Sequence, residues 1–367
     1  MFDTMRLLYL YSTPRSELFR QSLSGQGPDS GLYGLNHLWK FGIDAAFVDD
    51  GFVRGRLSSL WQLIHSTMAS HTGLGFNLEQ AMRLRAMLGR FDVVFTTTES
   101  CGLPVALLRH CGLVQTPIVF GSVGLAERAE GRQDGLAFRL YRRALASVDR
   151  VVYYGYDEGR SLSRLLGLPE RKLRFIRYGV DVDYFRPQRG GAAGFVLTAG
   201  KDACRDFDIF LAAVDGLDVP VKLVTSPGRL DGLRIPQNVE VQYSVPIGEL
   251  RDYYARSMFV VVPVRDNSYS AGTTVLLEAM SMGKAVIASR TRAIKRGYGL
   301  QGGENCVLVT PGNVTELRDA IRRLLANPLD AARIGRNARR AVEDSHSSEA
   351  YAGRLAGVFK EVYEERI

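Results

Sequence analysis

The residues of this 367-residue chain with the clearest chemical potential lie between Ser270 and Ser289, in SAGTTVLLEAMSMGKAVIAS. The segment follows a buried-strand pattern, MFVVVPV from Met258 to Val264, and has helix-forming composition from Thr273 to Met282. Because a helix between two parallel strands begins at the carboxyl edge of the sheet, its free N–H groups and its dipole favour an anion such as a diphosphate there. Glu278, just over one turn into the helix, is either a solvated residue or an acceptor for hydroxyl groups of that ligand.

A second candidate phosphate site lies in FVLTAGKDACRDFDIFLAAV, residues 195–214. Gly200 ends a strand pattern, and Lys201 and Arg205 precede a helical pattern. Arg205 can hold two phosphate oxygens at once, whereas Lys201 acts as a point charge. The alternative is that both are ordinary surface cations. The helix dipole disfavours cations at a helix start, so the pattern favours phosphate binding.

On these motifs the chain resembles the retaining glycosyltransferases of the GT-B fold, in particular family 4 (group 1). In that family two glutamates eight positions apart are followed by A-M-x-x-G-x-P-V-I-A. Glu278 matches the second glutamate, which binds the ribose hydroxyls, whereas Ser270 stands in place of the first and Ala285 in place of the proline. The resemblance implies a site for a nucleoside-diphosphate sugar, to which the helix start adds Gly272, Thr273 and Thr274.

The turn after Gly200 is similar to the family's G-R-x-x-x-x-K-G turn, whose two cations bind the donor diphosphate. Gly200 and Lys201 match the first pair with lysine for arginine, and Arg205 matches the second cation after a one-residue deletion. The resemblance implies that Lys201, Arg205 and Glu278 carry catalysis by holding the donor and stabilising the leaving diphosphate.

A metal site is not expected. Asp181-Val182-Asp183 spells the D-x-D with which transferases of the other major fold hold a cation, but such triplets arise often by chance, as does Asp206-Phe207-Asp208. The four cysteines have neither C-x-x-C spacing nor nearby histidines, which indicates neither a zinc site nor a disulfide framework. We therefore expect no metal, no cofactor besides the donor substrate, and thiols that stay reduced in the cytosol.

The first half of the chain alternates buried-strand and helical patterns, as a doubly wound parallel sheet requires. The expected strands are MRLLYLYS, DAAFVD, DVVFTTT, TPIVFGS and RVVYYG, and the expected helices are Gly31–Phe41, Leu78–Leu88, Leu103–Cys111 and Leu136–Ala146. A glycine-rich turn, SGQGPDSGLYG, follows the first strand, and the family resemblance places its Gly31 on the acceptor side. Glu99, just past DVVFTTT, is either an acceptor-side carboxylate or the cap of the next turn. The dinucleotide fingerprint G-x-G-x-x-G is not met, which disfavours a nicotinamide enzyme.

The length of the chain agrees with two domains. The family resemblance implies an α/β protein of the GT-B fold, with two Rossmann-like, doubly wound domains facing across a cleft. The first, residues 1–187, is the acceptor-side domain and ends in RYGVDVDYFRP, which is similar to the family's N-G-V-D-x-x-x-F-x-P segment. The second, residues 188–346, is expected to bind the nucleotide sugar. The resemblance implies that the C-terminal helix, residues 347–367, crosses back to the first domain.

The net charge of +8 and the pI near 9.3 favour anionic partners, which include nucleotide sugars, acidic lipids and nucleic acid. Nucleic acid is not expected, because the sequence has no basic array with interleaved aromatic residues. The segment GLAFRLYRRALASVDR, residues 135–150, predicts a helix with Phe138, Tyr141, Leu145 and Val148 on one face, which either packs on its own core or docks on anionic lipid. No stretch has the length of a membrane span or the layout of a signal peptide, so we expect a cytoplasmic protein whose membrane contact, if any, is peripheral on the inner face.

The family resemblance implies a retaining, metal-independent glycosyltransferase that moves a sugar from a nucleoside-diphosphate donor to a hydroxyl acceptor, lipid-linked or soluble. The setting would be surface polysaccharide, glycolipid or natural-product synthesis. One alternative is a nucleotide-sugar epimerase of the same fold. Another is a non-catalytic nucleotide-sugar binding protein, because the first glutamate of the family is absent and Val123-Gly124 stands where the family commonly has a histidine pair.

Overall fold

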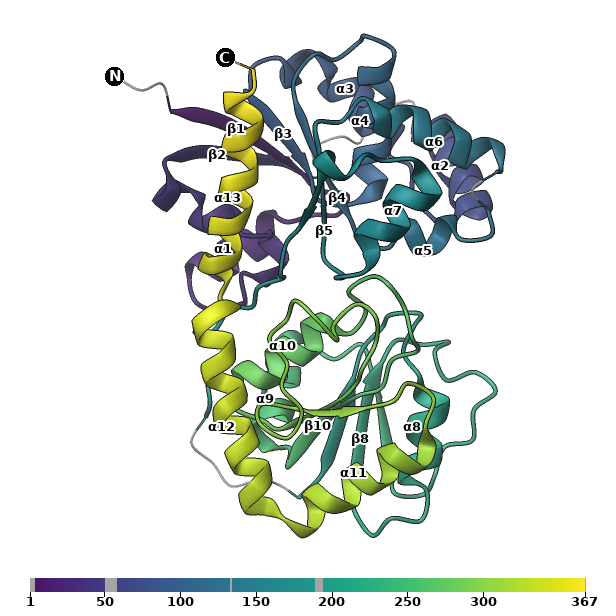
Figure 1. The fold of residues 1–367 in the computed structure, drawn as a ribbon, viewed down its shortest axis with the longest axis vertical. Coiled ribbons are helices and arrows are strands. Elements are labelled where there is room, and N and C mark those ends of the chain that lie inside the picture. Colours follow the sequence, from purple (N-terminus) through teal and green to yellow (C-terminus); the bar gives the residue numbers. More distant parts are fainter. Residues whose placement is uncertain (1–3, 50–57, 133, 189–193, 367) are drawn as a thin grey trace. The chain divides into compact units, whose positions relative to one another are not determined.

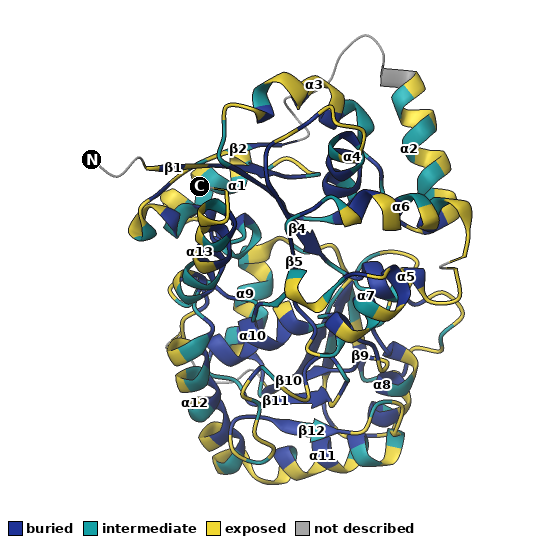
Figure 2. Cartoon of the chain, turned by 45° about the horizontal axis from the view of Figure 1, so that its top comes forward, coloured by how far each residue is buried: buried dark blue, intermediate teal, exposed yellow. Residues whose placement is uncertain are grey.

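Two parallel β-sheets with helices on their faces form the framework of the protein in this computed structural model (Figure 1). The structure describes residues 4–49, 58–132, 134–188 and 194–366. In Figure 2 the buried residues of each sheet and of the inner sides of its helices form the core. The α/β class predicted from the sequence, with two doubly wound sheets, is confirmed.

The chain divides into two compact units. Unit 1 comprises residues 1–24, 29–176 and 349–367, and unit 2 comprises residues 25–28 and 177–348. The segment 177–187, expected at the end of the first domain, thus belongs to unit 2. Its backbone explains why, because the Phe185 carbonyl accepts hydrogen bonds from Ser281 Oγ at 2.8 Å and from Arg339 Nη1 at 3.1 Å, both in unit 2.

Unit 1 contains, among its described residues, a six-stranded sheet in the order β2-β1-β3-β4-β5-β6, with every pair parallel. The strands are β1 (Met5–Leu10), β2 (Ile43–Val48), β3 (Val93–Thr96), β4 (Ile118–Ser122), β5 (Arg150–Tyr153) and β6 (Leu173–Phe175). The first five lie where the sequence predicted strands. The edge strand β6 was missed, because its three half-buried residues give no recognisable apolar run.

Helices of unit 1 cover both faces of this sheet. They are α1 (Ser16–Leu23), α2 (Ser58–Thr72), α3 (Leu78–Leu88), α4 (Glu99–His110), α5 (Leu125–Ala129), α6 (Leu136–Ala146), α7 (Glu158–Leu166) and α13 (Ser348–Glu364). The helical structure predicted over 31–41 is present, but as 3-10 helix rather than as α-helix. Two 3-10 helices, η1 (Ser30–Leu32) and η2 (Leu35–Phe41), stand there, since Tyr33 and Gly34 between them have φ of 53° and 78°. This left-handed backbone ends a right-handed helix.

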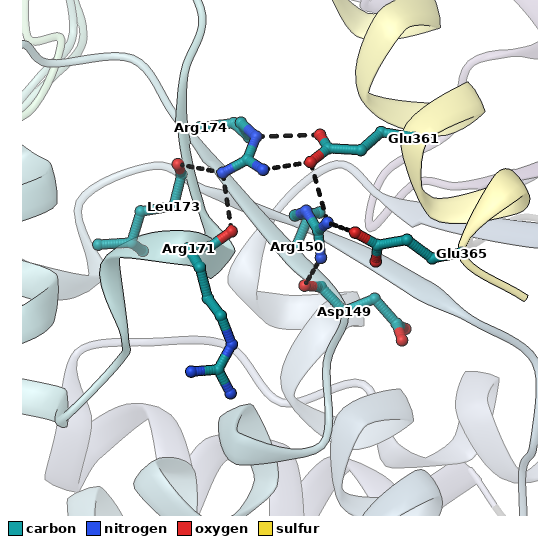
Figure 3. A network of polar contacts seen from close by, with 7 residues as sticks. All are labelled: Asp149, Arg150, Arg171, Leu173, Arg174, Glu361 and Glu365. Atoms are coloured by element: carbon teal, nitrogen blue, oxygen red, sulfur yellow. Dashed lines mark hydrogen bonds and ion pairs between the residues drawn. The ribbon is translucent and has the colours of Figure 1, made fainter.

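The C-terminal helix α13 is tied to the β5 and β6 edge of the sheet by ion pairs (Figure 3). Arg174 Nε donates to Glu361 Oε2 at 3.0 Å, and Arg150 Nη2 donates to Glu361 Oε1 at 2.9 Å. Arg150 also pairs with Glu365. The hydrogen bonds from Arg174 and Arg150 lower the pKa of Glu361 to about 2. The helix therefore belongs structurally to unit 1.

Unit 2 contains, over the part that is described, a second six-stranded parallel sheet in the order β12-β11-β10-β7-β8-β9. Its strands are β7 (Val196–Ala199), β8 (Val221–Thr225), β9 (Val239–Tyr243), β10 (Phe259–Val262), β11 (Val286–Ser289) and β12 (Val307–Val309), and its helices are α8 (Phe207–Val214), α9 (Ile247–Arg256), α10 (Thr273–Ser281), α11 (Val314–Ala326) and α12 (Pro328–Ser345). Strands β7 and β10 are neighbours at the centre of the sheet. Their carboxyl ends therefore bring together the two motifs that the sequence singled out.

Among the described residues, no helix has both the length and the apolar character that crossing a bilayer demands.

Candidate functional site

The turns that follow β7 and β10 are joined by backbone hydrogen bonds. Arg205 and Val264 form an antiparallel bridge, the Asp206 N–H donates to the Pro263 carbonyl at 3.0 Å, and the Arg265 N–H donates to the Cys204 carbonyl at 2.9 Å. This pairing fixes the first turn, which carries the predicted phosphate cations, against the second turn, which leads into α10.

Arg205 lies between the glycines of these two turns. A Cβ atom built on Gly200 would lie 2.1 Å from Arg205 Nε, and one built on Gly272 would lie 3.4 Å from Nη1. Only the absence of a side chain at Gly200 leaves room for the guanidinium. The two predicted donor-site glycines are thus the walls of the space that holds Arg205.

The Arg205 guanidinium is buried without full hydrogen bonding. The residue is 5% exposed, and neither Nε nor Nη1 has a partner among the residues that the structure describes. Burial lowers the pKa of Arg205, an effect opposed by the nearby Tyr254 and Asp202. A buried cation with unused donors is costly unless an anion completes its hydrogen bonds.

Glu278 lies close to this cation on α10 and is 6% exposed, so the interpretation as a solvated helix residue is wrong. The Tyr254 hydroxyl, from α9, donates to Glu278 Oε2 at 2.9 Å. Burial raises the pKa of Glu278 to about 7, although the Tyr254 hydrogen bond and the charge of Arg205 both lower it. Its other carboxylate oxygen, Oε1, is the atom that could meet a ligand hydroxyl.

The start of α10 depends on Gly272. This residue has φ of 77°, and a Cβ there would lie 2.8 Å from Val264 Cγ2, so any other residue would be strained at this position. Thr273 is buried, with no hydrogen-bond partner found for Oγ1 in the described part of the chain, whereas Thr274 is exposed and Ser270 is half-buried. The helix start therefore presents both backbone and hydroxyl groups for an anion.

Lys201 is exposed beside Gly200, as a flexible point charge would be. Its neighbour Asp202 is fixed by the Tyr269 hydroxyl, which donates to Oδ1 at 2.7 Å and to Oδ2 at 2.8 Å. No sequence pattern distinguishes Tyr254 or Tyr269, because a tyrosine in a helix or a turn resembles any core aromatic residue.

The two residues expected on the acceptor side lie in unit 1. A Cβ on Gly31 would come within 2.7 Å of Leu18 Cδ2, so packing between α1 and η1 already accounts for this glycine. Glu99 begins α4 and is buried, and its Oε1 accepts a hydrogen bond from the Val123 N–H at 2.5 Å. Burial raises the pKa of Glu99. The structure thus ties Glu99 to the turn after β4, which is not the turn that Glu99 was expected to cap, and its acceptor-side role stays a prediction.

A second buried carboxylate, Glu158, was missed. Ser122 Oγ donates to Glu158 Oε1 at 2.7 Å, and burial raises the pKa of Glu158 to about 8, with the charge of Glu99 adding to the shift. Its place in the sequence could have revealed it. Adjacent strands β3, β4 and β5 are followed at or near their carboxyl ends by Glu99, Ser122 and Glu158.

The D-x-D triplet has a structural use. Asp181 Oδ1 accepts hydrogen bonds from the backbone N–H groups of Asp183 at 3.1 Å and Tyr184 at 2.9 Å, which stabilise a turn. Nowhere in the described ranges do three His, Cys, Asp or Glu side chains gather closely enough to hold a metal ion.

Two family models match the chain. The model for "Glycosyl transferases group 1" matches residues 197–327, which include the site in unit 2, and the model for "Glycosyltransferase Family 4" matches residues 50–184. Among solved structures, sucrose-phosphate synthase from Thermosynechococcus elongatus superposes with a TM-score of 0.74 at 17% identity, covering 98% of this chain and all of that one. Anabaena Alr3699/HepE in complex with UDP-glucose gives a TM-score of 0.70 at 14% identity, covering 97% of this chain and 100% of that one. These likenesses establish the GT-B fold.

The chain matches only part of the length of its curated relatives. MMP α-(1→4)-mannosyltransferase of Mycolicibacterium hassiacum is 28% identical over 205 residues, which is 52% of this chain and 49% of the relative. D-inositol 3-phosphate glycosyltransferase 1 of Catenulispora acidiphila is 27% identical over 271 residues, which is 64% of this chain and 62% of the relative. The chain thus spans about half to two thirds of the length of these relatives. From the two family models and the fold, the chain belongs to the group 1, family 4 glycosyltransferases.

Proposed function

We propose that the protein is a glycosyltransferase that takes a sugar from a nucleoside-diphosphate donor bound in unit 2. The observation that carries the proposal is Arg205, a buried guanidinium held between Gly200 and Gly272, for whose Nε and Nη1 the described residues provide no acceptor. A diphosphate at the start of α10 would supply the missing acceptors. The family membership supports a sugar as the group attached to it.

In this proposal the protein stabilises the leaving group. Negative charge grows on the diphosphate as the bond to the sugar breaks, and Arg205, Lys201 and the N-terminus of α10 meet that charge. The donors are in place before the reaction, so they need little reorganisation during it. Glu278 would accept hydrogen bonds from the ribose hydroxyls, and Tyr254 would hold the Glu278 carboxylate in position.

We further propose that transfer retains the anomeric configuration and needs no metal ion. Front-face attack, in which the leaving diphosphate helps to deprotonate the acceptor hydroxyl, requires no protein base, and the cations of unit 2 provide the charge stabilisation that a metal would otherwise provide. Activity is expected to survive EDTA. Loss of activity that Mg²⁺ or Mn²⁺ restores would contradict this part of the proposal.

The acceptor is proposed to be a hydroxyl compound, and the relatives suggest where to begin. Their names indicate transfer to D-inositol 3-phosphate, to MMP and, in the case of α-D-kanosaminyltransferase of Streptomyces kanamyceticus, transfer of a kanosaminyl group. An acceptor panel should therefore begin with D-inositol 3-phosphate and MMP. An epimerase or a non-catalytic binding protein would use the same donor site, but family membership favours transfer.

The first experiment is a binding screen of UDP, GDP, ADP and CMP by isothermal titration calorimetry, followed by donor turnover with the sugar forms of the nucleotide that binds. We expect a nucleoside diphosphate to bind far more tightly than its nucleoside. Equal affinities for nucleoside and nucleoside diphosphate would contradict a diphosphate site at Arg205. An exposed arginine of the same unit, Arg229, provides the control variant Arg229→Met, which should bind as the wild type does.

A further inference from the structure

Helix α6 offers no docking surface on its apolar side, although its sequence is amphipathic. Phe138, Tyr141, Leu145 and Val148 are buried in the core of unit 1, so the sequence-based hypothesis that this side meets anionic lipid is wrong. The alternative, a helix packed on its own core with a basic outer edge, describes α6. Unit 1 has a hollow elsewhere, beside its edge strand β6.

A pocket of about 290 Å³ lies beside the ends of β5 and β6, and its lining belongs entirely to unit 1. Tyr153 and Phe175 are the last residues of the two strands and lie opposite each other in the sheet. The turn that leads into α7 adds Tyr156 to the lining. The charged residues of the lining come from that turn, from α7 and from the 3-10 helix η4 (Glu170–Lys172), and they are Asp157, Arg160 and Glu170.

Three aromatic rings of the lining form a continuous surface. The ring centroids of Tyr153 and Phe175 are 5.9 Å apart, and those of Tyr156 and Phe175 are 5.6 Å apart at an interplanar angle of 79°. Tyr156 is 38% exposed, and the other two residues are half-buried. A Cβ on Gly159 would lie 2.5 Å from the Tyr153 hydroxyl, so the glycine is what leaves room for this ring.

Polar groups of both charges border these rings. The side chains of Arg160 and Glu170 are exposed, and no other described residue holds them in a hydrogen bond or an ion pair. Burial raises the pKa of Tyr153, and the negative charges of Glu158 and Glu170 add to this effect. The Tyr153 hydroxyl therefore stays protonated and can donate a hydrogen bond. The pocket thus offers donors and acceptors together.

The size and the charges of the pocket indicate its ligand. Small-molecule sites measure roughly 300–1,000 Å³, so this pocket has room for a single ring rather than for a nucleotide. A cation would be repelled by Arg160, and an anion by Asp157 and Glu170. An uncharged ring with several hydroxyls meets neither conflict, because each hydroxyl can donate to a carboxylate or accept from the guanidinium. A sugar ring also has an apolar C–H face that suits the aromatic surface.

We propose that this pocket, called here the β6 pocket and defined by Tyr153, Tyr156, Arg160, Glu170 and Phe175, binds one uncharged sugar ring of a glycan. The C–H face would lie on the aromatic rings, while the hydroxyls donate to Glu170 and accept from Arg160. The pocket belongs to unit 1, whereas the donor cations belong to unit 2. Its role would be to hold a glycan acceptor by a ring that does not react. That role rests on the proposed transferase function, but ring binding is measurable without any donor.

Saturation-transfer difference NMR of the full chain, without nucleotide, tests the proposal. The neutral probes are the methyl glycosides of glucose, mannose, galactose and N-acetylglucosamine. Methyl glucuronide serves as the anionic probe and methyl glucosaminide as the cationic probe. We expect at least one neutral glycoside to bind with Kd on the order of 1 mM, more tightly than either charged probe, and to receive saturation at its ring C–H protons.

Substitutions at exposed lining positions locate the binding. Tyr156→Ala should weaken binding of the neutral glycoside by roughly 10-fold, because it removes one ring of the aromatic surface. Glu170→Gln should strengthen glucuronide binding by roughly 2–5-fold, since it removes a like charge, and Arg160→Gln should do the same for glucosaminide. The control is Tyr243→Ala, at a 52% exposed tyrosine of unit 2, which should bind as the wild type does.

Thermal melting establishes that each variant is folded. The proposal would be overturned by the absence of saturation transfer to every neutral glycoside, by wild-type binding in Tyr156→Ala, or by tighter binding of either charged probe. Absent glycoside binding together with intact nucleoside-diphosphate binding would refute the β6 pocket alone. Glycoside binding at the β6 pocket without any donor turnover would support the pocket and count against the transferase.

Discussion

Replacing Arg205 with methionine should stabilise the ligand-free protein and weaken diphosphate binding. Methionine is long and flexible enough to keep the aliphatic contacts of Arg205, but it removes the buried charge and both unused donors. An unsatisfied buried donor costs about 1–3 kcal/mol. Part of that cost is offset in the wild type by the attraction of Asp202 and Glu278, so we expect a net gain of about 2 kcal/mol.

The same substitution should destabilise the complex with a nucleoside diphosphate. A hydrogen bond to a charged group contributes about 1.5–3 kcal/mol, and Arg205 offers two donors to the diphosphate. Their loss should weaken diphosphate binding by at least ~3 kcal/mol, which is on the order of 100-fold in Kd. Binding of the nucleoside alone should change little, because it has no phosphate to meet Arg205.

Differential scanning calorimetry and titration calorimetry measure the two effects. For a domain of this size a gain of about 2 kcal/mol raises Tm by roughly 4–8 °C. Nucleoside diphosphate should raise the Tm of the wild type and of Arg229→Met but not that of Arg205→Met. A lower Tm for ligand-free Arg205→Met, together with an unchanged preference for diphosphate over nucleoside, would refute the interpretation of Arg205 as a preformed anion site.

Three further substitutions test other parts of the account. Glu278→Ala should weaken binding of nucleoside and nucleoside diphosphate equally, by about 1.5–3 kcal/mol, and an effect confined to the diphosphate would argue against a ribose contact. Lys201→Ala should reduce turnover of an intact donor more than nucleoside binding, and steady-state kinetics with parallel titrations would expose equal losses. Wild-type stability should fall as pH rises from about 4.5 to about 8, since Glu158, with pKa raised to about 8 by burial and by Glu99, stays protonated when folded but ionises when unfolded. Glu158→Gln should remove up to about 1.4 kcal/mol of this dependence per pH unit, and parallel melting curves for the two proteins at about pH 5 and about pH 8 would contradict it.

The central strands were predictable because they are buried on both faces, which gives continuous apolar runs. Strands β1, β3, β4 and β5 have this character, whereas β2 and β6 at the two edges are only partly buried. Helix α1 was also missed, and none of its side chains is fully buried. The left-handed Tyr33 could not be foreseen, because only its packing in the fold compels a non-glycine residue to adopt that backbone.

In the candidate site, the spacing of residues within each turn could be taken from the sequence, but the contact between the two turns could not. The sequence put Gly200 and Arg205 on one turn and Gly272 on another, and the order of strands in the sheet made them neighbours. That Arg205 is buried rather than exposed follows from the backbone bridge to Val264, which no local pattern records. The partnership of Glu278 with Tyr254 likewise depends on the packing of α9 beside α10.

The central claim, transfer of a sugar from a nucleotide donor with retained configuration, is tested most directly by NMR of the reaction mixture. The wild type is incubated with the sugar form of the nucleotide that it binds, with and without the acceptor panel, and the anomeric signals are followed over time. The account predicts release of the nucleoside diphosphate together with a new glycoside that has the anomeric configuration of the donor. A product of inverted configuration, an epimerised nucleotide sugar formed without acceptor, or an intact donor that stays bound with every acceptor would contradict it.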